Sequence, residues 1–153
     1  MHIRPAISED APAISVLILS VAHFFALDPA GRGAEDFLLS LQPAAVAARL
    51  ATAAFTTWVA VQGDNDDLAG VIVVRDGIHL FHLFVAEPFQ RRGCARQLWL
   101  HALSQAPQGT RMTVNATPFA RGFYERMGFI ATGPLVQTHG IAFVPMVYGS
   151  ARG

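Results

Sequence analysis

Three apolar segments rich in β-branched residues, separated by short turns, constrain the fold of this chain more than any other feature. They cover residues 55–61, 68–74 and 78–85. The connections Gly63–Asp67 and Asp76-Gly77 are typical of turns, so the three segments are expected to form an antiparallel meander. The third segment is apolar with hardly a break, which is typical of a central strand buried on both faces. The sequence therefore predicts a sheet that is covered on both sides.

The segments on either side of the meander predict further elements. A strand at His2–Ile7 leads, with Ser8 as N-cap, into a helix that runs to about Ala26. A second helical region covers residues 35–53 and is broken near Pro43. Beyond the meander the pattern predicts a helix at 93–105, a strand at 110–116, a helix at 118–127 and strands at 129–132 and 141–147. This order is typical of an α/β (α+β layered) fold on a mixed sheet.

Size and charge narrow the classes of function. A chain of 153 residues fits a single domain over residues 1–153, and 52% hydrophobic with only 14% charged residues predicts a packed core. The formal net charge is zero, which argues against a nucleic-acid partner, because such binding depends on clustered basic residues. The most apolar stretch, residues 11–27, is shorter than the roughly 20 apolar residues of a membrane span, so no membrane association is expected.

The cysteine and histidine content bears on compartment and metal binding. The single cysteine, Cys94, cannot form an internal disulfide, which fits a reducing cytoplasm. The six histidines show no spacing that is typical of metal ligands. We therefore expect a cytoplasmic protein without a metal cofactor.

The segment after the central strand combines features that favour a bound anion. It comprises residues 90–96, QRRGCAR. The first N–H groups of a helix have no internal partners, and the helix start carries about half a positive charge. Gly93 has no Cβ and Ala95 only a methyl group, so a phosphate can approach the backbone closely. On its own the segment also fits a basic turn that caps a helix. Its spacing differs from those of the P-loop and the dinucleotide-binding fingerprint.

Two segments of the chain resemble the signatures of the GNAT superfamily of N-acetyltransferases. In that family a strand ending in Val-x-Pro leads into Gln/Arg-x-x-Gly-x-Gly/Ala. This sequence matches the pattern with Val85, Pro88 (one residue later than in the commonest spacing), Gln90, Gly93 and Ala95. The second signature is Asn115 at the end of the next strand, followed by FYERMGF at residues 123–129. The order of elements resembles the family over nearly the whole chain.

This resemblance implies a mixed, mostly antiparallel sheet of about six or seven strands flanked by about four helices. In the family two neighbouring parallel strands splay apart, and the pantetheine arm of acetyl-CoA, the acyl donor, inserts between them. The backbone of Leu83, Phe84 and Val85 is expected to pair with that arm, and the backbone of residues 91–96 to hold the pyrophosphate. The residues assigned to coenzyme binding are Leu83, Phe84, Val85, Gln90, Arg91, Arg92, Gly93, Cys94, Ala95, Arg96 and Asn115. A strand-end cap is the alternative role for Asn115, and Cys94 is expected to be a small loop residue.

The resemblance also implies direct attack of an amine on the thioester. Tyr124 matches the position of a tyrosine that protonates the departing thiolate in many relatives. His79 matches the position of a proposed base, with ordered water as the alternative base. His82, three residues further along the strand, is expected to point to the opposite face and to be a hydrogen-bonded core histidine.

The acceptor is the part of the reaction about which the sequence says least. In relatives the segments containing His23 and His139 line the acceptor pocket, so either side chain could contact the substrate. We expect a small-molecule amine or a peptide as acceptor, and a homodimer is a further expectation. The alternative function is a non-catalytic sensor of the same fold that binds acyl-CoA.

Overall fold

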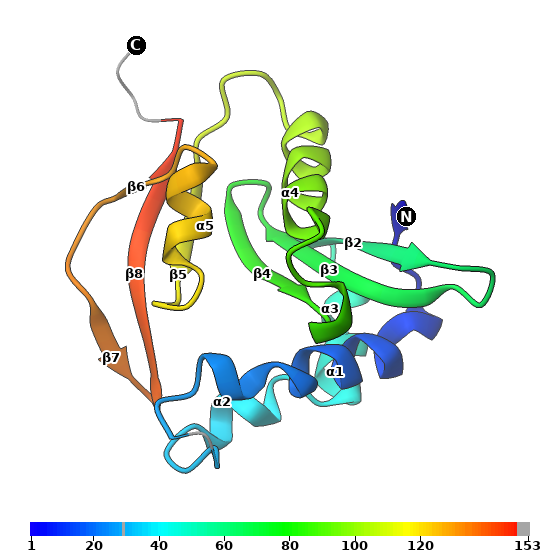
Figure 1. Ribbon diagram of the computed structural model, residues 1–153, viewed down its shortest axis with the longest axis horizontal. Coiled ribbons are helices and arrows are strands. Elements are labelled where there is room, and N and C mark those ends of the chain that lie inside the picture. Colours follow the sequence, from blue (N-terminus) through cyan, green and yellow to red (C-terminus); the bar gives the residue numbers. More distant parts are fainter. Residues whose placement is uncertain (29, 150–153) are drawn as a thin grey trace.

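The computed structural model of the chain describes residues 1–28 and 30–149, and its fold is built on a mixed sheet (Figure 1). The strand order is β1-β2-β3-β4-β5-β8-β6, and β7 pairs with β8. The strands are β1 His2–Pro5, β2 Phe55–Gln62, β3 Asp67–Arg75, β4 His79–Val85, β5 Met112–Ala116, β6 Ile130–Ala131, β7 Val136–Thr138 and β8 Ile141–Tyr148. Apart from the parallel pair β4–β5, neighbouring strands are antiparallel.

Five α-helices and three 3₁₀ turns complete the fold. The helices are α1 Ala11–Ser20, α2 Glu35–Leu39, α3 Pro43–Leu50, α4 Cys94–Gln105 and α5 Arg121–Arg126, and the turns are η1 Ser8–Asp10, η2 Ala22–Phe24 and η3 Glu87–Phe89. The predicted α/β layered fold on a mixed, mostly antiparallel sheet is confirmed. The described residues hold eight strands rather than six or seven, and five helices rather than about four. The break at Pro43 is confirmed, because Gln42 before it is extended (ψ 157°).

The sheet carries a hydrophobic core on each face. On the face covered by α4 and α5, here called the α4 face, Trp99 is 1% exposed and Ile72 is fully buried. On the face covered by α1 and α3, the α1 face, Ile14 is 1% exposed and Val71 is fully buried. Strand β4 supplies side chains to both cores. The prediction of a central strand buried on both faces is therefore confirmed.

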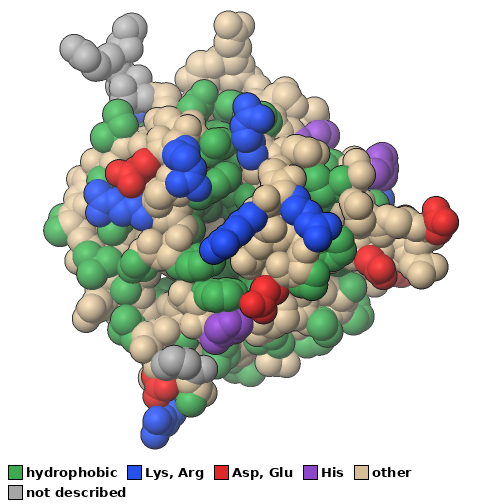
Figure 2. Space-filling view, in the orientation of Figure 1, with side chains coloured by type: hydrophobic (Ala, Val, Ile, Leu, Met, Phe, Trp, Pro, Cys, Tyr) green, Lys and Arg blue, Asp and Glu red, His purple; other side chains and the backbone are tan. Residues whose placement is uncertain are grey.

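The parallel strands β4 and β5 pair only at their first residues. The partners are His79 with Thr113 and Leu80 with Val114. Beyond them β4 continues along β3 alone and β5 along β8 alone. Figure 1 shows the two strands diverging, and Figure 2, in the same orientation, shows hydrophobic side chains between arginines on this side of the molecule. The predicted splayed pair of parallel strands is confirmed.

A β-bulge in β4 changes the face to which one predicted side chain points. The register with β3 jumps from Val73–His82 to Val74–Leu80, so Phe81 is an extra residue. His82 consequently lies on the α1 face, where it lines a small cavity with Ile14 of α1. His79 bonds to Thr113, which alternates along β5 with residues buried on the α4 face, so His79 also lies on the α1 face. The prediction that the two histidines point to opposite faces is wrong, because period-two alternation fails at a bulge.

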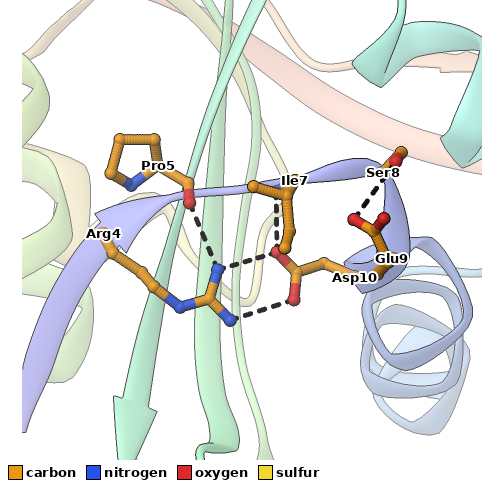
Figure 3. A network of polar contacts seen from close by, with 6 residues as sticks. All are labelled: Arg4, Pro5, Ile7, Ser8, Glu9 and Asp10. Atoms are coloured by element: carbon orange, nitrogen blue, oxygen red, sulfur yellow. Dashed lines mark hydrogen bonds and ion pairs between the residues drawn. The ribbon is translucent and has the colours of Figure 1, made fainter.

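The junction between β1 and α1 is fixed by Asp10 (Figure 3). Arg4 donates to both carboxylate oxygens, at 2.8 and 3.0 Å, and the Ile7 N–H donates to Oδ2 at 2.7 Å. The hydrogen bond from Arg4 holds the pKa of Asp10 below its ordinary value, although burial acts in the opposite direction. Ser8 is not the helix cap that its residue type predicts, since its hydroxyl donates to Glu9. Asp10 occupies the N-cap position of α1, but its carboxylate bonds back to Arg4 and Ile7 and caps no N–H group of the helix.

His82 is the buried group whose charge state matters most for stability. It is 6% exposed, and its Nε2 is the one fully enclosed side-chain nitrogen or oxygen without a hydrogen-bond partner in residues 1–28 and 30–149. The prediction of a core histidine is confirmed, but the expected hydrogen bond is missing at Nε2. Burial, and then the charge of Arg49, lower the pKa of His82 to about 3.

This pKa predicts how stability depends on pH. The imidazole stays neutral in the folded state and takes up a proton in the unfolded state. Its contribution to the free energy of unfolding is therefore fully present above pH ~6.5 and is lost as the pH falls toward 3. At pH 5 the loss amounts to about 2 kcal/mol. Replacing His82 by Leu should leave the free energy of unfolding at pH 7 unchanged or higher and should remove this loss.

Urea unfolding of both chains at pH 7, 6 and 5 checks the prediction. The control is His2→Gln at the exposed end of β1, where the side chain is solvated in the folded and unfolded states alike. Equal pH dependence in the His82→Leu variant and the unsubstituted chain would contradict it.

Candidate functional site

The N-terminus of α4 follows the open end of β4 and has the form of an anion site. The first internal bond of the helix runs from Gln97 N–H to Gly93 O at 3.0 Å, and no side chain caps the helix. The three N–H groups that precede Gln97 in the helix therefore have no intrahelical partner. Gly93 has a φ of 81°, and a Cβ built on it would meet nothing within 4 Å. Because Gly93 has no side chain, the space beside the free N–H groups of the helix stays open. A phosphate group could accept hydrogen bonds there.

The loop from β4 to α4 is fastened to the sheet by polar and steric contacts. Gln90 Nε2 donates to Val85 O at 3.0 Å, and Ala86 N–H donates to Ala69 O at 2.9 Å. Gly70 of β3 lies under the helix start, and a Cβ there would approach Cys94 Sγ to 3.0 Å. The absence of a side chain at Gly70 therefore allows α4 to begin close to the sheet.

Cys94 points into the core rather than toward the loop surface. Its side chain is 2% exposed, and burial raises the pKa of the thiol to about 11. A thiol in this environment stays protonated and is a weak nucleophile. This agrees with the interpretation of Cys94 as a small residue whose backbone N–H, not its sulfur, faces the anion site.

Arginines surround the start of α4 on the surface. Arg91, Arg92 and Arg96 are exposed, and none of them forms an ion pair with another residue in the described part of the chain. Arg91 also has a positive φ of 64°, which is uncommon outside glycine and is often found at functional sites. Figure 2 shows arginines gathered around hydrophobic side chains in the middle of this view. We call Arg91, Arg92 and Arg96 the arginine rim.

The unpaired edge of β4 offers backbone groups to a ligand. Ala86 N–H bonds to β3, and because strand hydrogen bonds alternate, the N–H groups of Leu83 and Val85 point away from β3 into the gap. The same alternation directs the backbone groups of Phe84 toward β3, so the expectation that the Phe84 backbone pairs with the pantetheine arm is wrong. The carbonyl of Val85 is already used by Gln90. Leu83 and Val85 therefore present an edge that an extended amide-containing chain could pair with.

Tyr124 of α5 lies on the α4 face of the gap. It is 5% exposed and packs edge-on against Phe123 and Phe129, with ring centroids 5.2 Å away in each case. Burial raises the pKa of its phenol well above the ordinary value. Among the described residues nothing hydrogen bonds to the hydroxyl. The phenol is therefore a protonated donor throughout the physiological pH range.

His79 and Asn115 lie on the α1 face, opposite Tyr124. His79 Nδ1 is 2.8 Å from Thr113 Oγ1, and burial, then Arg75, lower the pKa of the imidazole. Asn115 is exposed on β5 and aligns with Pro145 of β8. The site thus has a protonated phenol on one face of the sheet and a neutral imidazole on the other. Thr113, which fixes His79, is a residue that sequence reasoning missed.

Aromatic rings flank the gap on the α1 face. Phe25 lies 5.1 Å from Phe84 between ring centroids, and Phe24 stacks on Phe119 at 4.6 Å. His23 is exposed and its ring lies 4.1 Å from that of Phe24. His139, in the β7–β8 turn, is exposed and contacts Thr138, 2.8 Å away through Nδ1. Phe119 was not identified from the sequence, because a lone Phe after Pro118 gives no periodic signal.

In residues 1–28 and 30–149 no three His, Cys, Asp or Glu side chains come together in a way that could hold a metal ion. No helix in the same part of the chain has the length and apolarity needed to cross a bilayer.

Comparison with known proteins places this geometry in a family. The family model described as Acetyltransferase (GNAT) domain matches residues 25–149. Peptidyl-lysine N-acetyltransferase YjaB of Salmonella typhimurium is 37% identical over 76 residues, which are 50% of this chain and 51% of YjaB; the Escherichia coli protein of the same name is also 37% identical over 76 residues. The matched region thus spans about half the length of these curated relatives.

Solved structures share the fold over almost the whole chain. A GCN5-related N-acetyltransferase from Rhodopseudomonas palustris has a TM-score of 0.75 at 20% identity, with 96% of this chain and 94% of that one covered. Apo YjaB from Escherichia coli has a TM-score of 0.64 at 25% identity, with 98% of each chain covered. PaiA N-acetyltransferase from Thermoplasma acidophilum, solved with coenzyme A, has a TM-score of 0.73 at 15% identity, with 96% and 97% covered. Because the family model matches residues 25–149, the chain belongs to the GNAT acetyltransferase family.

Proposed function

We propose that this chain is an enzyme that transfers the acetyl group of acetyl-CoA to a primary amine. The observation that carries the proposal is the open end of the β4–β5 pair, which lies directly before the uncapped N-terminus of α4. Together these features offer a strand edge for an amide chain and backbone donors for phosphates. The activity in the name of YjaB and the coenzyme A in the PaiA structure support the same donor.

The donor would lie along β4 and across the start of α4. Leu83 and Val85 would pair with the two amides of the pantetheine arm, and Phe84 would contribute its side chain. The pyrophosphate would accept hydrogen bonds from the N–H groups of residues 94–96, and the arginine rim would face its charge. Gln90 would act indirectly, because its amide holds the loop to Val85.

The acceptor nitrogen would attack the thioester carbonyl carbon directly. A C–N bond forms as the C–S bond breaks, and the coenzyme leaves as a thiolate. The proton of the incoming amine goes to His79 or to an ordered water, with Asn115 placed to position that water. The pKa of Tyr124 lies above its ordinary value, so full proton transfer to a thiolate is uphill. Its main contribution would be a hydrogen bond that stabilises the developing negative charge on sulfur.

The acceptor would be a small-molecule amine or the lysine of a peptide. The name of YjaB favours a peptide lysine. The buried, unpaired Cys94 is compatible with a reducing cytoplasm as the compartment.

Two measurements test the proposal as a whole. Calorimetric titration with coenzyme A is expected to show saturable binding, and failure to bind would overturn the proposal. Thiol release from acetyl-CoA over a panel of amino acids, polyamines, aminoglycosides and lysine peptides then separates an enzyme from a sensor. Binding without acceptor-dependent thiol release would favour the sensor.

Gly93 gives a sharp test of the anion site. Replacing Gly93 by Ala adds a Cβ at the open space and strains a φ of 81°, so the dissociation constant for coenzyme A should rise by about tenfold or more. Gly63→Ala is the matched control, because Gly63 in the β2–β3 turn has a φ of 76° and equally open surroundings. Equal coenzyme affinity in the two variants would remove Gly93 from the site.

Tyr124→Phe tests the role of the phenol. Without the hydroxyl, kcat should fall by roughly 10²-fold while the dissociation constant for coenzyme A stays nearly unchanged. Tyr148→Phe is the control, since Tyr148 of β8 packs against Trp99 of α4, with 5.3 Å between ring centroids, at the edge of the core. Steady-state kinetics with titration calorimetry make the comparison, and an unaltered kcat in Tyr124→Phe would exclude the assignment.

His79→Gln distinguishes a side-chain base from water. Because the pKa of His79 is lowered, the imidazole is neutral at pH 7 and able to accept a proton, and the rate should decline at a lower pH than with an ordinary imidazole. If His79 is the base, kcat/KM at pH 7 should drop by about tenfold or more in the variant and this acidic decline should disappear. A drop of less than about twofold would assign the role to water.

A further inference from the structure

Phe24 and Phe119 stack across the open end of the β4–β5 pair. Their ring centroids are 4.6 Å apart and the ring planes differ by 16°. Phe24 belongs to η2 and packs on the core of the α1 face, whereas Phe119 lies in the turn after β5. Beyond their first residues β4 and β5 are unpaired, and side chains connect them instead: Phe119 after β5 stacks on Phe24, and the adjacent Phe25 packs on Phe84 of β4.

The exposure of Phe119 indicates a role outside the core. The side chain is 61% exposed although it stacks on another ring, and His23 adds a third ring 4.1 Å from Phe24. Exposed apolar side chains that cluster usually mark a binding surface. The stack also lies close to β4, because Phe25, the residue after Phe24, is 5.1 Å from Phe84 of β4 between ring centroids.

The two partners of the stack differ in how firmly they are held. The segment after Phe24 is tied to the β7–β8 hairpin, because Ala26 bridges Ile141 and Leu27 N–H donates to Gly140 O at 2.8 Å. Phe119 lies in an exposed turn and its ring can move away without opening the core. Aromatic pairs are only modestly stabilising, so separation of the rings is readily reversible.

We propose that Phe24 and Phe119 form an aromatic gate that shields the thioester from water until an amine enters from the α1 face. The inference rests on the proposed function. The reaction to be prevented is hydrolysis: water attacks the acetyl carbon, a C–O bond forms, the C–S bond breaks, and acetate and the free thiol result. While the rings are in contact they keep water from the thioester, and an amine on an unbranched chain enters after only a small displacement of Phe119. The gate therefore favours unbranched alkyl amines, a class that includes the lysine side chain.

The test compares thiol release from acetyl-CoA with and without an amine. Phe119→Ala should increase the amine-independent rate by about fivefold or more, because water then reaches the thioester, while coenzyme A affinity stays within about twofold. It should also reduce the preference for n-butylamine over a branched amine such as tert-butylamine. Phe119→Tyr keeps the stack and should behave like the unsubstituted chain. Ile130→Ala is the matched control, since Ile130 in β6 is 60% exposed and lies away from the gap.

The outcomes separate the gate from the proposed function. If the unsubstituted chain binds coenzyme A and acetylates amines, but Phe119→Ala leaves the ratio of hydrolysis to transfer unchanged, the gate is wrong and the acetyltransferase stands. If the unsubstituted chain binds no coenzyme, both proposals fall. Phe24→Leu opens the gate from the other side and should produce the same increase; it replaces Phe119→Ala as the test if that variant does not fold. A change in Ile130→Ala equal to that in Phe119→Ala would also overturn the gate.

Discussion

The early end of pairing between β4 and β5 is the constraint on which the rest of the site depends. A strand in the middle of a sheet normally satisfies its backbone donors and acceptors on both sides. Here β4 loses its second partner after Leu80 while it stays paired with β3 as far as Val85. The N–H groups of Leu83 and Val85 are thereby left for a partner outside the fold. Such a partner must be extended and must carry amides, which is why the opening selects the kind of ligand proposed above.

The sheet also separates the two side chains proposed to handle protons, Tyr124 and His79. Tyr124 lies on the α4 face, on the side of the helix start that would hold the donor, and its burial keeps the phenol protonated. His79 lies on the α1 face, beside Thr113, and its lowered pKa keeps the imidazole neutral. The proposed hydrogen-bond donor to the leaving group and the proposed proton acceptor for the amine thus lie on opposite sides of the opening. The β-bulge at Phe81 leaves His79 in this position but moves His82 into the core beneath α1.

Much of the fold followed from patterns that are local in the sequence. The meander, the break at Pro43 and the helix after Gly93 depend on apolar periodicity and on turn residues, and each lies where it was predicted. The bulge at Phe81 cannot be recognised in the sequence. The residues on both sides of Phe81 are apolar or histidine, so an extra residue does not change the hydrophobic pattern. The short strand β7 was missed for a similar reason, since three residues are too few to show alternation.

The residues of the candidate site also differ in whether the sequence predicted them. The loop with Gly93 was identified from its spacing, and the geometry there explains why a glycine is needed. The supporting residues were invisible to sequence reasoning, because their roles depend on contacts between distant segments. Gly70 allows Cys94 to approach β3, and Thr113 orients His79 from the neighbouring strand. A glycine inside one strand and a threonine on the exposed side of another show no such role in the sequence, because the residue that each contacts is far away along the chain.

The arginine rim has a consequence for the lifetime of the protein in the presence of a reactive thioester. All 11 basic side chains of the chain are arginines, and it has no lysine. A lysine beside a bound acyl donor would be neutral part of the time and could be acylated, losing its charge. A guanidinium keeps its proton at any physiological pH and has no free lone pair to react. A rim built only from arginine would therefore remain chemically unaltered in the presence of an activated acetyl donor.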